Sequence, residues 1–109
     1  MNLKIECASI EEVRANIDRI DRLIVELLSE RGGYVKQAAQ FKKTSDDVKA
    51  PQRVEQVIAR VKVLANELGA NPSVIEQVYR AMISGFIDAE LAEHAAHQGR
   101  NSILGSIPS

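Results

Sequence analysis

One apolar stripe through the first forty residues constrains the fold of this 109-residue chain more than any other feature. "SIEE", Ser9 to Glu12, has the form of a capping box, in which the serine side chain caps the first turn of a helix. From Val13 to Phe41, apolar residues recur at steps of three and four, the spacing of one helix face. The stripe keeps its phase across Gly32-Gly33, where a turn would normally reset it. We therefore predict one helix over about residues 9–43, in which each glycine costs about 1 kcal/mol.

The paired glycines leave one alternative open, a break that turns this segment into two helices. If the helix is continuous, Gly32-Gly33 instead indicates the close approach of another backbone or of a ligand. A helix–turn–helix nucleic-acid binder would need the break and a basic face as well. The net charge of -1 gives no general attraction to nucleic acid.

Two shorter helices are expected after the first. The polar stretch "TSDDVKAP", residues 44–51, is predicted to be a loop, with Pro51 at the first position of a helix that Gly69 ends. Asn71 caps a third helix, "SVIE" offers a second capping box, and the apolar pattern fades near Gln98. With no strand pattern, the fold class is all-α: one long and two shorter helices. We divide the chain into an N-terminal extension (1–8), a helical domain (9–98) and a flexible C-terminal tail (99–109).

The length of the first helix predicts a dimer. Such a helix is roughly 50 Å long, whereas a compact domain of this size is only about 35 Å across. The two shorter helices cannot cover its whole apolar stripe. A second copy of the chain is the simplest cover, so we expect an intertwined homodimer.

Composition excludes several classes of protein. Cys7 is the only cysteine, so the chain has neither a disulfide framework nor a thiolate metal site. No signal-peptide core or membrane-spanning run is present, and a cytoplasmic location is expected. His94 and His97 lie three residues apart near Glu90 and form a conceivable metal face. A solvated helix end explains them better, and we predict no metal and no cofactor.

Charged residues interrupt the apolar faces. Lys42 follows Arg31 by eleven residues, so both lie on the stripe, about 20° apart. Arg14 lies about 100° from Arg31 around the same helix. Arg53 precedes the next stripe, and Glu90 is in phase with the apolar face of the third helix. Each alone is explained by snorkelling or a structural ion pair. Together they indicate a water-poor pocket for an anionic ligand, because unpaired buried charges cost several kcal/mol and arginine binds carboxylates bidentately.

"VRANIDRIDRLIVELLSER" and "FKK" resemble the first helix of the small all-helical chorismate mutases, the AroQ type. In that family an arginine opens the helix, a second follows seventeen residues later, and a lysine follows eleven residues after that. Arg14, Arg31 and Lys42 reproduce both spacings, and Arg53 matches the next family arginine. The resemblance implies an entwined dimer with two equivalent pockets, each receiving Arg14 from the other chain.

The resemblance also implies a reaction and roles for the residues. Chorismate would rearrange to prephenate in a pericyclic step that needs no nucleophile, metal or cofactor. The pocket would select the compact conformer and place positive charge at the breaking C–O bond. Such an enzyme serves aromatic amino-acid biosynthesis. The implied catalytic residues are Lys42, at the ether oxygen, and Glu90; the implied substrate-binding residues are Arg14, Arg31, Arg53, Val54 and Phe86.

Four positions depart from the mutase pattern. Ala50 and Val54 occupy positions where the family often has acids near the ring hydroxyl, and Phe86 occupies a position where the family has a serine. "APQRV" is similar to the isochorismate–pyruvate lyases, which release pyruvate and leave salicylate on the same fold. The alternatives are therefore this lyase, in salicylate biosynthesis, or a non-enzymatic regulatory helical dimer.

Glu90 replaces a glutamine that usually donates a hydrogen bond to the ether oxygen. An ionised carboxylate there would repel the developing negative charge, whereas a protonated one would donate. If Glu90 acts protonated, activity falls as pH rises, and Glu90→Gln restores it at high pH. The alternative is that Glu90 only pairs with Lys42 or Arg53.

Overall fold

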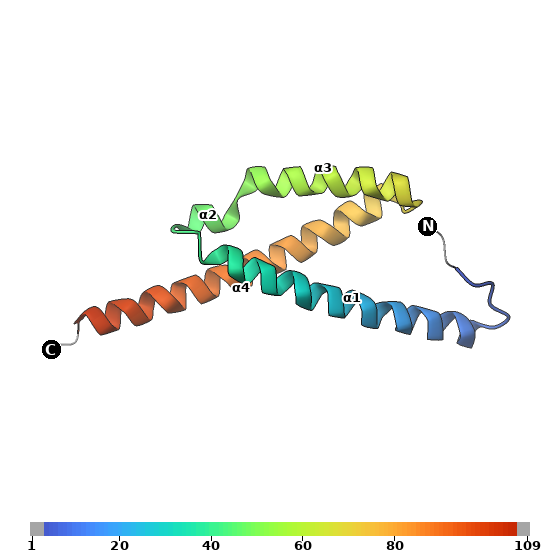
Figure 1. The fold of residues 1–109 in the computed structure, drawn as a ribbon, viewed down its shortest axis with the longest axis horizontal. Helices are drawn as coiled ribbons and strands as arrows, with labels where there is room; N and C mark the ends of the chain where they lie inside the picture. Colours follow the sequence, from blue (N-terminus) through green and yellow to red (C-terminus); the bar gives the residue numbers. More distant parts are fainter. Residues whose placement is uncertain (1–3, 107–109) are drawn as a thin grey trace.

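The structure is a computed structural model that describes residues 4–106, with side chains described as far as residue 96. Within this range it consists of helices and their connections (Figure 1): α1 (Ile10–Ala39), α2 (Ser45–Lys49), α3 (Pro51–Leu68) and α4 (Pro72–Ser106). The predicted all-helical fold is confirmed, but α4, with 35 residues, is longer than α1, with 30, whereas the first helix was predicted to be the longest. The short helix α2 was not predicted.

Helix α1 is continuous through Gly32-Gly33, as the phase of the stripe predicts. The Ser9 hydroxyl accepts the Glu12 N–H at 3.2 Å and so caps the first turn. The Glu12 carboxylate accepts the N–H of Ala8 at 2.8 Å, so the return half of the capping box reaches one residue further back than expected. The helix ends at Ala39, four residues before the predicted end.

The loop predicted for residues 44–51 is wrong, because α2 occupies most of it. The Thr44 hydroxyl accepts the Asp47 N–H at 3.1 Å, and the Asp47 carboxylate accepts the N–H groups of Lys43 and Thr44, also at 3.1 Å. A full capping box therefore starts this single turn and a half of helix. Ala50, at φ 37°, makes the corner into α3, and Pro51 opens α3 as predicted.

The ends of α3 and the start of α4 follow the sequence signals. Gly69 ends α3 in the left-handed conformation, at φ 76°. The Asn71 side chain accepts the Ser73 N–H at 3.0 Å, which caps α4 and leaves the second predicted box at Ser73 without a role as a cap. Helix α4 runs to Ser106 rather than fading near residue 98. Residues 1–3 and 107–109 lie outside the described range, and the division into extension, domain and tail stays a prediction.

The core lies between α3 and α4. Val57, Ile58 and Val61 of α3 pack with Ile83 of α4, and all four are buried. Val48 of α2 is only 2% exposed, so the short helix also buries its one apolar residue.

A surface clamp of charged residues also joins α3 and α4. The Arg80 guanidinium binds both oxygens of Glu55 at 2.9 Å, and its Nε donates to Glu76 at 2.9 Å. These hydrogen bonds lower the pKa of the Glu55 carboxyl. Because the pairs are solvent-exposed, their contribution to stability is modest.

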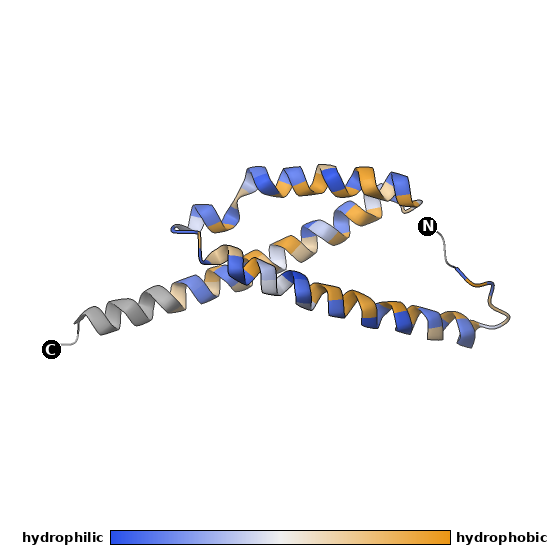
Figure 2. Cartoon of the chain, viewed as in Figure 1, coloured by the Kyte–Doolittle hydropathy of each residue, from blue (hydrophilic) through white to orange (hydrophobic). Residues whose placement is uncertain are grey.

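Helix α1 lies outside this core. None of its residues is buried. Five apolar residues along one side, here called the α1 stripe, are all more than a third exposed: Val13, Ile17, Ile20, Ile24 and Leu27. Figure 2 shows hydrophobic residues recurring along the length of this helix. The radius of gyration is 19.2 Å, against about 13 Å for a compact chain of this length.

No helix in residues 4–106 is both long enough and apolar enough to cross a membrane.

Candidate functional site

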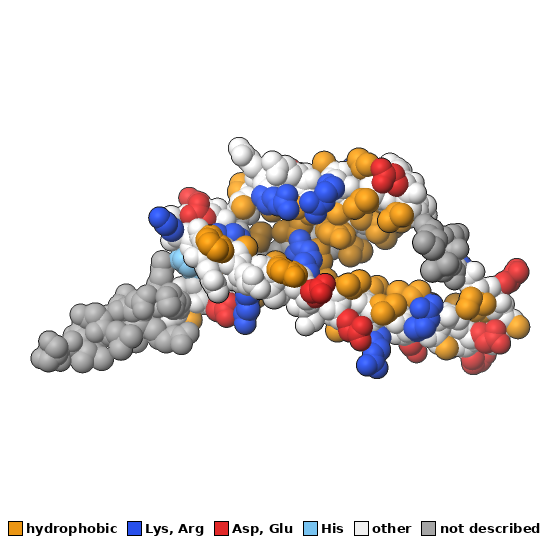
Figure 3. All heavy atoms as spheres, in the orientation of Figure 1, with side chains coloured by type: hydrophobic (Ala, Val, Ile, Leu, Met, Phe, Trp, Pro, Cys, Tyr) orange, Lys and Arg blue, Asp and Glu red, His pale blue; other side chains and the backbone are white. Residues whose placement is uncertain are grey.

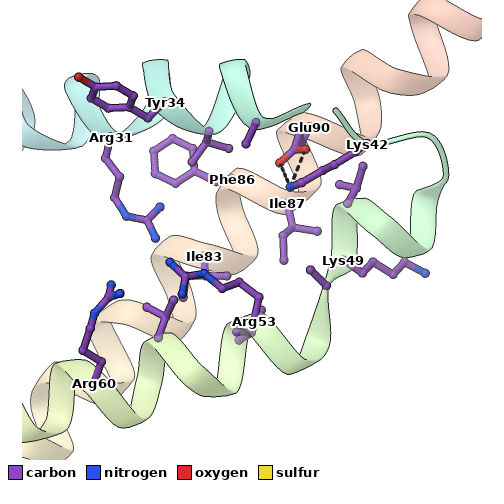
Figure 4. Close-up of a pocket in the computed structure, with 16 residues that line it drawn as sticks. Arg31, Tyr34, Lys42, Lys49, Arg53, Arg60, Ile83, Phe86, Ile87 and Glu90 are labelled. Atoms are coloured by element: carbon purple, nitrogen blue, oxygen red, sulfur yellow. Dashed lines mark hydrogen bonds and ion pairs between the residues drawn. The ribbon is translucent and has the colours of Figure 1, made fainter. Parts of the chain in front are cut away.

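A cavity of about 400 Å³ opens where the end of α1 meets α2, α3 and α4 (Figure 4). Its wall carries five cations and one carboxylate: Arg31, Lys42, Lys49, Arg53, Arg60 and Glu90. Apolar side chains, among them Val54, Ile83, Phe86 and Ile87, make up most of the remaining wall. In Figure 3, Lys and Arg side chains gather around the hydrophobic hollow between the helices.

The structure brings most of the predicted site residues to this one cavity. Arg31, Lys42, Arg53, Val54, Phe86 and Glu90 all line it. Arg14 does not, because seventeen residues of helix place it about 25 Å from Arg31 along the axis of α1. Within one chain, Arg14 is therefore too distant to contribute to the site.

Two cations of the cavity wall, Lys49 and Arg60, were not predicted. Lys49 was assigned to a loop, so nothing in its pattern placed it on a wall. Arg60 carried a signal that was available: it follows Arg53 by seven residues, which is two turns of helix and the same face.

Phe86 and Gly32 set the position of Arg31. The Arg31 guanidinium carbon lies 5.7 Å from the centre of the Phe86 ring, within the range of a cation–π contact. The ring in turn lies against Gly32, where an added Cβ would come within 3.0 Å of the Phe86 Cε1 atom. The close approach at Gly32 is therefore made by an aromatic side chain and not by the backbone or ligand that the sequence predicted; among the described residues, no atom lies within 4 Å of a Cβ position at Gly33.

Lys42 and Glu90 form an ion pair at the other end of the cavity. The Lys42 ammonium donates to the two Glu90 oxygens at 3.1 and 3.5 Å. The Glu90 side chain is 5% exposed and that of Lys42 is 24% exposed. An ammonium has three N–H donors, so at least one stays available for a ligand. Glu90 thereby holds the cation in place beside the cavity.

The charges of the wall do not balance. Glu90 neutralises Lys42, and in the part of the chain with described side chains no ion pair involves Arg31, Lys49, Arg53 or Arg60. Guanidinium groups bind carboxylates and phosphates in forked, bidentate geometry. A cavity with this excess of positive charge and an apolar wall suits a small ligand with more than one negative charge.

Among the residues with described side chains, no three His, Cys, Asp or Glu groups stand close enough to hold a metal ion. The side chain of His97, half of the conceivable metal face, lies outside that set.

Comparison with known proteins gives two matches. Residues 13–91 match the family described as chorismate mutase type II. An isochorismate pyruvate lyase of Pseudomonas aeruginosa is 31% identical over 86 residues, which cover 79% of this chain and 85% of the relative. The family match spans every residue of the cavity wall.

Proposed function

The chain belongs to the chorismate mutase type II family, and we propose that its cationic cavity binds a chorismate-like dianion and cleaves the ether bond of that substrate. The family is one of enzymes that act on small substrates of this kind. The observation that carries the proposal is a set of three arginines around an apolar hollow, Arg31, Arg53 and Arg60, beside the buried Lys42–Glu90 pair. Among the residues with described side chains, none of the three has a carboxylate partner.

We further propose that a second copy of the chain completes the site. The α1 stripe needs a cover that one chain does not supply. An antiparallel second α1 laid on this stripe would carry its own Arg14 toward the first chain's cavity. This arrangement accounts for an arginine that lies about 25 Å from the cavity within its own chain.

In the proposed mechanism, Arg31, together with the Arg14 of the second copy, holds one carboxylate of the substrate and helps to select its compact conformer. The free N–H of Lys42 lies at the ether oxygen, where electron density collects as the C–O bond breaks. In the rearrangement a C–C bond forms between the two fragments as the C–O bond breaks. In the elimination the hydrogen of the ring carbon that bears the hydroxyl moves to the methylene carbon of the enolpyruvyl group, so that pyruvate leaves and the ring becomes aromatic. A fixed cation at the ether oxygen stabilises the transition state more than the ground state. Glu90 orients this cation, and the Phe86 ring packs against the Arg31 guanidinium.

Two observations favour elimination of pyruvate from isochorismate over rearrangement of chorismate, which the sequence put first. The first is the similarity to the isochorismate pyruvate lyase. The second is the apolar wall at Ala50 and Val54, where mutases often have acids. A substrate hydroxyl facing that wall would lose its hydrogen bonds, at a cost of about 1–3 kcal/mol. Chorismate rearrangement remains the second candidate, favoured by the family that the chain matches.

The test is incubation of the purified protein with isochorismate and, separately, with chorismate. We expect salicylate and pyruvate from isochorismate; prephenate from chorismate would establish the second candidate instead. Conversion of neither would reject an enzyme of this family type and leave a non-enzymatic helical dimer.

Arg31→Ala should lower kcat/KM by about 100-fold or more, because it removes a bidentate carboxylate contact worth about 3 kcal/mol in a desolvated site. Helicity measured by circular dichroism should be unchanged. Arg22→Ala is the matched control, since Arg22 pairs with Glu26 on the exposed side of the same helix. Equal activities of the two variants would contradict the assigned site.

A further inference from the structure

Arg60 lies at the end of the cavity away from the Lys42–Glu90 pair (Figure 4). The resemblance to the mutases assigns it no role, and the mechanism above does not use it. Its seven-residue spacing from Arg53 puts both arginines on the same face of α3, about 10 Å apart along the axis. This distance is short enough for two long side chains to converge on one small group.

The side chains of Arg31, Arg53 and Arg60 point toward one another across the cavity in Figure 4. Among the residues with described side chains, no ion pair or hydrogen bond engages the guanidinium group of any of the three. Their mutual repulsion is weak while water fills the cavity and increases when water is excluded. A covered cavity with three guanidinium groups is stable only if anions enter with the substrate.

The placement of the three arginines on two helices indicates two anionic groups. One carboxylate, held bidentately, occupies one guanidinium fork. Arg31 faces the cavity from α1, whereas Arg53 and Arg60 face it from α3. The two helices therefore offer separate guanidinium sets to a ligand that lies between them.

We propose that Arg53 and Arg60 together form a second carboxylate subsite, so that the cavity selects dicarboxylates over monocarboxylates. Arg60 is then a binding residue that sets substrate specificity, in addition to the arginine carried over from the family pattern. This inference rests on the proposed function for the location of the ligand, but it does not depend on which reaction follows.

The experiment measures binding rather than turnover. Isophthalate, a rigid aromatic dicarboxylate, and benzoate, its monocarboxylate counterpart, are titrated into the full-length protein by calorimetry. We expect isophthalate to bind the unaltered protein at least tenfold more tightly than benzoate. In Arg60→Gln the isophthalate affinity should fall at least fivefold, while the benzoate affinity stays within twofold.

Lys62→Gln is the matched control. It removes one positive charge from the same helix two residues away, and Lys62 pairs with Glu76 at 3.0 Å outside the cavity. Its affinities for both acids should stay within twofold of the unaltered protein. A thermal melt of each variant verifies that it is folded.

Three results would overturn the inference: equal binding of the two acids by the unaltered protein, an unchanged isophthalate-to-benzoate ratio in Arg60→Gln, or the same losses in Lys62→Gln. If Arg60 pairs with an acid of a second copy instead, Arg60→Gln shifts the association of the chains and leaves that ratio unchanged, which also overturns it. The proposed function fails by a separate result, the absence of conversion of both chorismate and isochorismate.

Discussion

Among single residues, Glu90 is the least expected, because a group beside an ether oxygen should donate a hydrogen bond and an ionised carboxylate only accepts one. Its carboxylate is buried, and the structure shows why the fold tolerates it: both oxygens accept from the Lys42 ammonium. The ion pair lowers the net positive charge at the position where electron density is expected to collect. Glu90 therefore holds Lys42 in place and at the same time weakens its electrostatic effect.

Glu90→Gln separates these two contributions. If a protonated Glu90 is required, the activity of the unaltered protein falls as pH rises, and the variant is the more active of the two at high pH, because its amide donates at any pH. The measurement is kcat/KM against pH for both proteins. A rate independent of pH in both would reject the role of proton donor for Glu90 and leave the positioning of Lys42 as its function.

The residues of the cavity wall were predictable to different degrees. Arg31, Lys42 and Arg53 were found because their spacing matches a family pattern and because a cation on an apolar stripe needs a reason. Arg60 was missed because it matches no such pattern, although its two-turn spacing from Arg53 was visible. The partner of Glu90 could not be chosen from the sequence, since Lys42 and Arg53 were both candidates. The structure identifies Lys42 as the partner, because α4 packs against the end of α1 and brings the two side chains together.

At the scale of elements, α2 shows what periodicity cannot detect. A helix of five residues is shorter than the window over which an apolar repeat can be counted. Its signal was instead the local pair Thr44 and Asp47, a capping box of the same form as the one recognised at Ser9. The long helices were predictable because thirty or so residues of one phase outweigh two glycines. The ends of these helices were less predictable: α1 ends before its apolar pattern does, and α4 continues beyond its apolar pattern.

The Asp47 cap makes α2 sensitive to acid. Hydrogen bonds from the Lys43 and Thr44 N–H groups lower the pKa of Asp47. Because the folded pKa lies below the unfolded value of about 3.9, this contribution to stability is present above that pH. It is lost as pH falls through the folded pKa.

We expect the amide resonances of Lys43 and Thr44 to titrate with a midpoint below about pH 3.9 as the cap breaks, and to lose this transition in Asp47→Asn. Two-dimensional NMR spectra from pH 5 downward provide the measurement. A midpoint at or above the unfolded value, or the same titration in the variant, would show that the cap does not hold α2. Since Val48 and Lys49 reach the cavity from this helix, opening it would also loosen the cavity wall.

For the whole molecule, the decisive feature is a chain whose longest dimension is 70 Å and whose first helix has no buried residue. The core between α3 and α4 is small, and the apolar area that a stable domain would normally enclose remains on the outside. Burying one isoleucine contributes about 1.5–3 kcal/mol, so covering the α1 stripe would add several times that amount. We infer that association supplies a large part of the stability of the fold.

Ile24→Asp tests this inference, because a carboxylate without a partner in a covered stripe costs several kcal/mol. We expect the variant to sediment as a monomer at concentrations where the unaltered protein is a dimer, with reduced helicity and reduced activity. Arg22→Asp puts the same carboxylate on the opposite face of α1 and should leave the mass unchanged. If the unaltered protein sediments as a monomer, or if the two variants behave alike, the covered stripe is refuted.

The uncovered stripe has a consequence for how the protein comes to be. In the proposed dimer, a newly made chain leaves the ribosome with the α1 stripe, about 20 Å long, exposed to water until it meets a second copy. The chain is most prone to aggregate in that interval. Rapid synthesis raises the concentration of chains and so shortens the time before two of them associate, but it also brings incompletely folded chains together. The yield of folded protein in a producing cell should therefore depend more on the rate at which two copies associate than on the stability of a single copy.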